Sequence, residues 1–171
     1  MTSIWKLARK SFLSICFIAM LAVTSLVPGT SAYAGTVDLL PGRWTGYGKI
    51  KMLNGASERV KCVATYFLKN KGRAINHNLR CASASYRIDA TADLDVHKGR
   101  VSGQWQERTY VKSGAVAGRV TSSGFNVTIE SAGFAAAMLV RTPSACRQSI
   151  DIQPKRGLEI KGLTIGLARG C

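Results

Sequence analysis

The sequence has few of the side chains on which catalysis and metal binding usually depend. Its 171 residues include two histidines and nine acidic residues. No Cys-x-x-Cys or His-x-x-x-His spacing occurs, so the spacings typical of zinc sites are missing. We therefore expect no catalytic residues, no metal and no cofactor, and we expect a non-enzymatic protein.

The few titratable side chains that could suggest chemistry have simpler interpretations. Asp89, Asp93 and Asp95 lie on one face of a predicted strand, which supplies too few oxygens for calcium, so we interpret them as a solvated stripe. His97 lies in a predicted turn, where it is solvated. His77 falls on an apolar strand face, and we expect it to be half-buried and hydrogen-bonded. A pocket that joined His77 to an acidic side chain would instead favour an enzyme.

Acidic residues are missing from the N-terminal segment, which resembles a secretory signal peptide. Three basic residues come first, namely Lys6, Arg9 and Lys10. An uncharged apolar run follows over residues 12–27, and a small-residue triplet, Ala32-Tyr33-Ala34, comes after it. This arrangement predicts a signal peptide over residues 1–34, cleaved after Ala34. An uncleaved membrane anchor is the alternative. A lipoprotein signal at Cys16 is rejected because Ile15 is bulky where a small residue is required.

Without this segment the chain is strongly basic. Cleavage removes three of the 24 basic residues and none of the nine acidic ones, which leaves a net charge of +12. Such a charge favours anionic partners, including lipid headgroups, lipopolysaccharide, acidic glycans and nucleic acid. No block of five or more basic residues occurs, so an ordinary solvated surface explains the charge equally well. We expect a periplasmic or secreted protein with no membrane span after cleavage, and we rank nucleic acid last among its partners.

The segment 35–171 lacks a helical period and instead alternates with a period of two residues. In residues 42–52 small or apolar side chains alternate with polar ones, which indicates a strand with one wet face. Similar segments follow at intervals of about 8–12 residues, separated by turns such as Asn70-Lys71-Gly72 and Lys112-Ser113-Gly114. The pattern predicts a single all-β domain over residues 35–171, an up-and-down antiparallel meander closed into a barrel of about 8–10 strands.

Four cysteines remain after signal cleavage, an even number that indicates disulfides in an exported chain. A hairpin centred between Lys71 and Gly72 places Cys62 opposite Cys81, close enough to bridge. Cys146 and Cys171 lie near the ends of the last predicted hairpin, about two residues out of register, which a bulge or a loose tail would absorb. We expect these two pairs, and the rival pairing joins the C-terminal cysteine to an early strand.

The first and last strands resemble those of the lipocalin and calycin group. Gly42-Arg43-Trp44 opens the first strand, a meander follows, and Arg169 lies late in the chain. The resemblance implies a lipocalin-like barrel in which Trp44 closes one end and Arg169 lies across its indole. The chain is shorter than the members of that group, and its turns are short where ligand-gating loops are expected. It looks more like the small exported barrels of Gram-negative envelopes.

The predicted inner face is rich in small and aromatic side chains, which either fill the barrel or leave room for a ligand. The candidate ligand-binding residues are Trp44, Tyr66, Tyr86, Trp105, Glu107 and Phe125. An inward-facing Glu107 would need an arginine or lysine partner. We expect a binding protein that takes a small apolar or amphipathic ligand inside the barrel, or an anionic envelope component on its basic surface. The alternative is an interaction protein, such as a periplasmic protease inhibitor or a secreted effector, that acts through residues 35–41.

Overall fold

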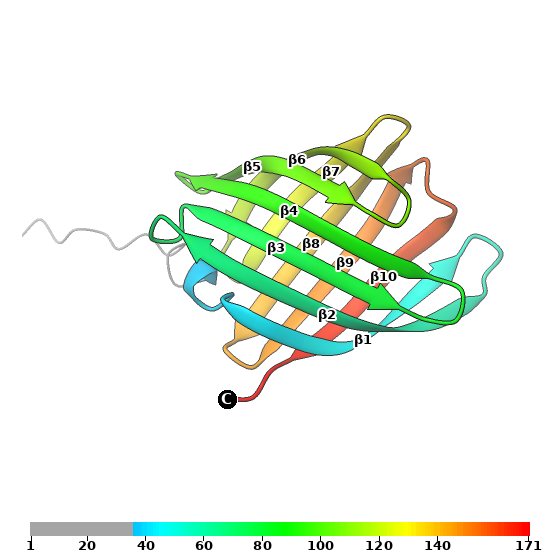
Figure 1. The fold of residues 1–171 in the computed structure, drawn as a ribbon, viewed down its shortest axis with the longest axis horizontal. Helices are drawn as coiled ribbons and strands as arrows, with labels where there is room; N and C mark the ends of the chain where they lie inside the picture. The colour runs from blue at the N-terminus through cyan, green and yellow to red at the C-terminus, as the bar shows by residue number, and fades with distance from the viewer. Residues whose placement is uncertain (1–35) are drawn as a thin grey trace, which may run out of the picture.

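The fold of the described residues is almost entirely β-sheet. The computed structural model describes residues 36–171, so the predicted signal peptide lies outside the described residues. Ten strands follow in chain order (Figure 1): β1 (Gly42–Met52), β2 (Ser57–Lys69), β3 (Ala74–Ala82), β4 (Arg87–His97), β5 (Arg100–Glu107), β6 (Lys112–Thr121), β7 (Gly124–Ser131), β8 (Phe134–Ser144), β9 (Arg147–Arg156) and β10 (Ile160–Ala168). The predicted all-β class is confirmed.

The strands form a closed up-and-down barrel. Each strand pairs antiparallel with the next, and β10 pairs back onto β1, where Thr45 lies opposite Ala168 and Lys49 opposite Thr164. Closure removes the free sheet edges that would otherwise invite pairing with other chains. The predicted meander is therefore confirmed, at the upper limit of the expected strand number.

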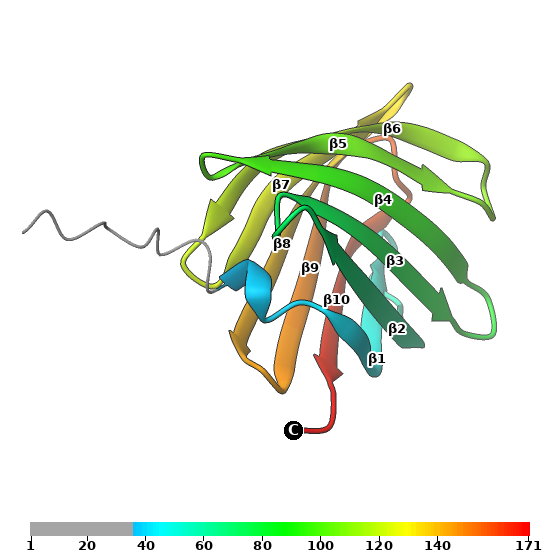
Figure 2. The same cartoon turned by 60° about the vertical axis from the view of Figure 1, so that its left-hand side comes forward.

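The two ends of the barrel differ in what covers them (Figures 1 and 2). One end, here called the terminal end, carries residues 36–41 and the C-terminal residues 169–171. The other end, the hairpin end, carries the turns that join β1 to β2, β3 to β4, β5 to β6, β7 to β8 and β9 to β10. Any site inside the barrel is therefore approached from the hairpin end.

The terminal end is plugged by the first described residues and by Trp44. Trp44 is fully buried, and its Nε1 donates a hydrogen bond of 2.8 Å to the carbonyl oxygen of Leu40. The guanidinium of Arg169 lies 4.2 Å from the centroid of the indole ring. Its N–H groups donate to the backbone carbonyls of Leu39, Pro41 and Ala145. The plug and its arginine are those that the lipocalin resemblance implies.

This plug also removes the basis of the inhibitor interpretation. A helical turn at 36–38 leads into the barrel, and Thr36, Val37 and Leu40 are all buried. Thr36 Oγ1 donates a hydrogen bond to the carbonyl oxygen of Ser122 on the β6–β7 turn. Because Thr36, Val37 and Leu40 are packed into the barrel, this segment is not free to enter the cleft of a partner.

Both expected disulfides are present. Cys62 of β2 lies directly opposite Cys81 of β3, and the two are bonded. Cys146 is bonded to Cys171. The backbone N–H of Arg169 donates to the carbonyl oxygen of Cys146, so Cys171 lies in the tail beyond the last ladder residue. A loose tail, and not a bulge, therefore accounts for the two-residue offset.

The predicted turn at Lys112-Ser113-Gly114 is wrong. Residues 108–111 form the turn, where Val111 takes a φ of 51°, and β6 begins at Lys112. Gly114 lies opposite Trp105 within the sheet. A Cβ atom at this position would approach the carbonyl oxygen of Glu130 to 1.7 Å. The glycine therefore permits close contact between strands and does not mark a turn.

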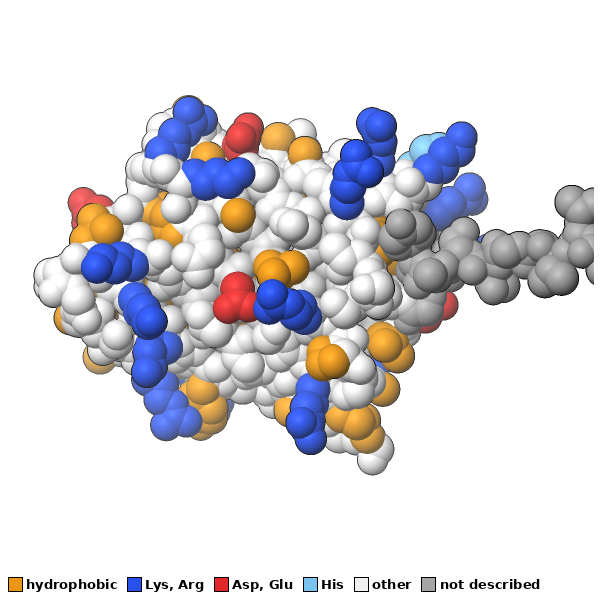
Figure 3. Space-filling view, turned by 180° about the vertical axis from the view of Figure 1, so that it is seen from behind, with side chains coloured by type: hydrophobic (Ala, Val, Ile, Leu, Met, Phe, Trp, Pro, Cys, Tyr) orange, Lys and Arg blue, Asp and Glu red, His pale blue; other side chains and the backbone are white. Residues whose placement is uncertain are grey.

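Basic side chains are exposed at separate places on one face of the barrel (Figure 3). On the face shown in Figure 3, lysine and arginine side chains occur at several separate places and not in one continuous patch. Residues 36–171 contain no helix that is long and apolar enough to cross a membrane. On the face that Figure 3 shows, positive charge is not concentrated at one place.

Candidate ligand-binding site

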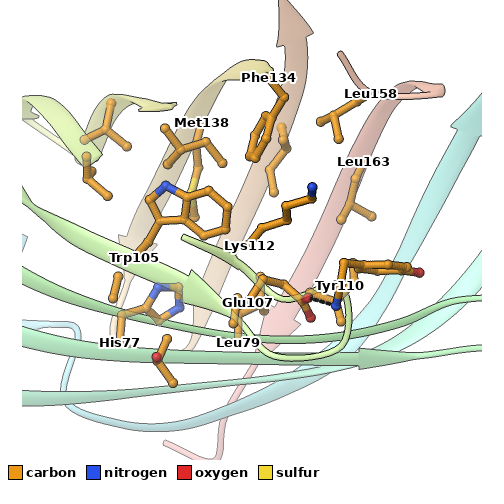
Figure 4. Close-up of a pocket in the computed structure, with 18 of the residues that line it drawn as sticks. His77, Leu79, Trp105, Glu107, Tyr110, Lys112, Phe134, Met138, Leu158 and Leu163 are labelled. Carbon is orange, nitrogen blue, oxygen red and sulfur yellow. Dashed lines mark hydrogen bonds between the residues drawn. The ribbon is translucent and has the colours of Figure 1, made fainter. Parts of the chain in front are cut away.

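The barrel encloses a cavity of about 720 Å³ that extends to the hairpin end. Residues of three turns at that end line its mouth, among them Tyr110, Gly133 and Leu158. Figure 4 shows side chains from several strands converging on this space. The volume lies within the range of about 300–1,000 Å³ that is typical of small-molecule sites. The sequence left open whether the interior is filled, and the structure shows it to be hollow.

The cavity exists because small side chains face inward on β4. Ala92 lies between His77 of β3 and Trp105 of β5, and Ala90 lies between Leu79 and Glu107 in the next row. A single methyl group separates the large side chains in each row. The neighbouring rings and chains do not fill the space above these methyl groups, and both alanines line the cavity.

The cavity has one apolar wall and one wall with polar groups. The wall formed by β7–β10 is apolar and includes Phe125, Val127, Ile129, Phe134, Met138, Val140, Ile152 and Leu163. The opposite wall, from β2 to β6, carries Tyr66, His77, Glu107 and Lys112. An apolar lining with a few polar groups is the usual composition of a site for an amphipathic small molecule.

Five of the six residues that the sequence suggested for ligand binding line this cavity, namely Tyr66, Tyr86, Trp105, Glu107 and Phe125. The sixth, Trp44, forms the plug at the terminal end and does not line the cavity. The sequence analysis placed His77 on an apolar strand face but did not name it as a ligand-binding residue, and it did not name Ala90 or Ala92 either. All three line the cavity.

His77 differs from the expected half-buried, hydrogen-bonded histidine. Its residue is 7% exposed, and its ring stacks on Tyr66 with centroids 4.3 Å apart and planes inclined by 5°. Its Nε2 atom has no hydrogen-bond partner within residues 36–171. Burial lowers the pKa of His77 to about 4, because the charged imidazolium is disfavoured away from water. The ring is therefore neutral at pH 7.

Tyr66 is held by a buried chain of hydrogen bonds that does not include the histidine. The Tyr66 hydroxyl donates to Oε1 of Gln148 at 3.0 Å, and Nε2 of Gln148 donates to Oγ1 of Thr142 at 3.1 Å. Burial raises the pKa of the Tyr66 phenol, so the hydroxyl stays protonated. This chain fixes the ring on which His77 stacks.

Glu107 faces the cavity without the basic partner expected for it. Its carboxylate accepts hydrogen bonds from the backbone N–H of Asp89, at 2.8 Å, and of Tyr110 (Figure 4). Lys112 lies opposite Glu107 in the sheet, yet no ion pair within 4.0 Å joins them in the described part of the chain. Two backbone amides satisfy the acid, which therefore anchors the β5–β6 turn at the mouth of the cavity.

His77 and Glu107 line one cavity, the condition under which an acid–base enzyme was expected. No hydrogen bond or ion pair joins the two side chains within residues 36–171. His77 Nε2 has no partner, and the Glu107 carboxylate accepts from the backbone N–H groups of Asp89 and Tyr110. Asp89 forms ion pairs with Arg80 and Arg108, consistent with the predicted outward stripe. Within residues 36–171, no cluster of three histidine, cysteine or acidic side chains could hold a metal ion. The arrangement is suited to binding.

Comparison with known proteins extends the description of the fold. No protein-family model and no curated protein sequence matches the chain. The crystal structure of Rv2717c from M. tuberculosis is similar, with a TM-score of 0.66 and 15% identity over 81% of this chain and 98% of that one. The S-type phycobiliprotein lyase CPES from Guillardia theta has a TM-score of 0.55 and 11% identity, over 80% and 92% of the two chains. The chain is thus similar in fold to these β-barrel proteins.

Proposed function

We propose that this protein is an exported, non-enzymatic binding protein that holds a small apolar or amphipathic molecule inside its barrel. The observation that carries the proposal is the cavity of about 720 Å³ between an apolar wall and a partly polar wall. A well-packed interior of native density would leave few voids larger than a water molecule. An apolar space of this size therefore favours a bound molecule over an unused void.

We assign binding to the interior and not to the basic exterior. An anionic envelope component would need a concentrated set of positive charges. The lysine and arginine side chains instead occur at separate places on the visible face. The interior offers a defined shape and a mouth at the hairpin end, which makes it the stronger candidate.

Export is part of the proposal. Disulfides persist in oxidising compartments such as the periplasm, and the chain has two of them. Together with the expected signal peptide over residues 1–34, they favour a periplasmic or secreted protein. N-terminal sequencing of protein from the periplasmic fraction tests this, with Gly35 as the expected first residue. Recovery of an intact N-terminus from the cytoplasmic fraction would contradict it.

Ligand extraction tests the binding function directly. Protein purified from the native host is extracted with organic solvent, and the extract is compared by mass spectrometry with that of an Ala92→Phe variant. Phenylalanine at this inward position occupies the space above β4, so we expect the extracted molecule to be lost while the thermal unfolding midpoint is kept. Ala117→Phe places the same side chain on the exposed face of β6 and should leave the extract unchanged.

Two outcomes would overturn the proposal. One is an extract from the wild-type protein that contains no co-purified molecule, together with a failure to bind an apolar fluorophore such as 1-methylpyrene. The other is an unchanged extract from a folded Ala92→Phe variant, which would place the bound molecule outside the cavity.

A further inference from the structure

His77 lines the cavity and carries a buried polar atom, Nε2, that is unsatisfied. Within the described residues, its Nε2 is the buried side-chain nitrogen or oxygen that lacks a hydrogen-bond partner. Buried polar groups are nearly always hydrogen-bonded, and an unsatisfied one lowers stability, so each exception needs an explanation. Nε2 itself is fully buried, so water does not supply the missing bond, and a ligand group reaches this atom only with a small movement of the ring or its neighbours.

The ring is nevertheless held in a defined position. One face stacks on Tyr66, which is itself fixed by its hydrogen bond to Gln148. On the other side the sheet neighbour is Ala92, a single methyl group, and the indole of Trp105 comes next. Figure 4 shows the imidazole and this indole together at one wall of the cavity. A polar group that is oriented by its neighbours but left unpaired is what a ligand anchor requires.

We propose that His77 is the polar anchor of the cavity, and that the bound molecule is an otherwise apolar alcohol or phenol whose neutral hydroxyl group hydrogen-bonds to this imidazole. The inference rests on the proposed binding function and specifies its ligand class. A neutral imidazole has one donor and one acceptor nitrogen, and a hydroxyl group can both donate and accept. A hydroxyl therefore matches Nε2 in either tautomer.

A charged ligand group fits this position poorly. Burial keeps the imidazole neutral at pH 7, so it offers no charge to a carboxylate. Its register neighbours in the sheet are Tyr66 and Ala92, neither of which is cationic. Lys112 lies opposite Glu107, in the neighbouring row of residues across the sheet, which is closer to the hairpin end than the row of His77. An anionic group beside His77 would therefore be buried without a partner, which is strongly unfavourable.

A matched pair of fluorescent probes tests the anchor. The probes are 1-hydroxypyrene and 1-methylpyrene, which share shape and size and differ by a hydroxyl against a methyl group. Their dissociation constants are measured at pH 7 for the wild-type protein, for His77→Phe and for His97→Phe. The last variant makes the same substitution at an exposed histidine at the end of β4.

We expect His77→Phe to lower the preference for 1-hydroxypyrene over 1-methylpyrene by about tenfold, the effect of one net hydrogen bond. Binding of 1-methylpyrene should be kept, and His97→Phe should show the wild-type preference. An unchanged preference in His77→Phe, with both probes bound, would overturn the anchor and leave the binding function standing. Failure of both probes to bind the wild-type protein would overturn the anchor, and together with an extract that contains no co-purified molecule it would overturn the binding function as well.

A second measurement does not depend on the variant folding. The ring nitrogens of His77 are followed by ¹⁵N NMR in the wild-type protein as each probe is added. We expect the Nε2 resonance to shift with 1-hydroxypyrene and to move far less with 1-methylpyrene. Equal shifts, or none with either bound probe, would show that the hydroxyl group does not reach this nitrogen, and the anchor would be rejected.

Discussion

The imidazole of His77 lies parallel to the phenol ring of Tyr66, with ring centroids 4.3 Å apart and planes inclined by 5°. The two residues face each other across β2 and β3, so the sheet register brings the rings together. The Tyr66 hydroxyl is satisfied by Gln148, whereas Nε2 of His77 has no partner within residues 36–171. The sheet register therefore pairs a hydrogen-bonded ring with one whose buried nitrogen is unsatisfied, the feature from which we propose His77 as a ligand anchor.

The buried histidine makes the barrel sensitive to acid. Burial lowers the pKa of His77 from 6.5 to about 4, so between these values the unfolded chain binds a proton that the folded chain does not. The free energy of unfolding should therefore fall as the pH falls from 6.5 to 4, by about 3 kcal/mol at most for this group. Urea denaturation at several pH values measures the effect.

The control for this prediction is His77→Phe, the variant that has no titratable group at position 77. His77→Phe should lose less stability than the wild-type protein over the same pH range, while His97→Phe, at an exposed site, should follow the wild type. At pH 7 we expect His77→Phe to be more stable by about 1 kcal/mol, because it removes an unsatisfied polar atom. Identical pH profiles for wild type and His77→Phe would contradict the buried, neutral imidazole.

The hydrogen bond between Tyr66 and Gln148 should stabilise the barrel measurably. Tyr66→Phe keeps the ring that stacks on His77 but leaves the buried Gln148 Oε1 without its donor, at a cost of about 1–3 kcal/mol. Tyr47→Phe makes the same change on the outer face, where the ring is 51% exposed, and should cost less than about 0.5 kcal/mol. Equal effects of the two substitutions in thermal denaturation would count against a specific role for the buried bond.

Much of the fold was predictable from local patterns. Alternation of small or apolar with polar residues predicts each strand, and the turn at Lys71-Gly72 fixes a register that brings Cys62 opposite Cys81. These signals are local, since a two-residue period and a glycine turn are read within a few positions. The turn at 108–111 contains neither glycine nor proline, so no comparable signal marked it.

The site was less predictable, because its properties depend on residues far apart in the chain. Alternation places His77 on the inner face, but whether its nitrogens find partners depends on side chains from other strands. The hydroxyl of Tyr66 finds its acceptor 82 positions away, at Gln148. Whether the interior is filled likewise depends on the summed volumes of the inward-facing side chains of ten strands. The inward pair Ala90 and Ala92 was the available signal for a hollow interior.

Arg169 should contribute strongly to closing the terminal end. Its planar guanidinium lies over Trp44 and donates to the backbone carbonyls of Leu39, Pro41 and Ala145. Lysine cannot reproduce this stacked, multiply hydrogen-bonded geometry. Arg169→Lys should therefore lower the free energy of unfolding by about 1–3 kcal/mol.

The measurement is urea denaturation followed by tryptophan fluorescence, which also reports on Trp44. Arg147→Lys changes an exposed arginine at the start of β9 and serves as the matched control, with an expected change below about 0.5 kcal/mol. A loss of stability no larger in Arg169→Lys than in this control would show that the plug does not depend on the guanidinium.

Two glycines on facing strands should respond in opposite ways to the same substitution. A Cβ atom on Gly46 of β1 would lie 2.0 Å from the carbonyl oxygen of Gly166 on β10, and a closed barrel cannot easily move that backbone apart. Gly46→Ala should therefore cost about 3 kcal/mol or more, or prevent folding. A Cβ atom on Gly166 meets nothing within 4 Å, so Gly166→Ala should raise stability by about 0.4–1 kcal/mol by restricting the unfolded chain. Circular dichroism during thermal denaturation compares the two variants. A Gly46→Ala protein as stable as the wild type would contradict the close approach of β1 and β10 on which closure of the barrel depends.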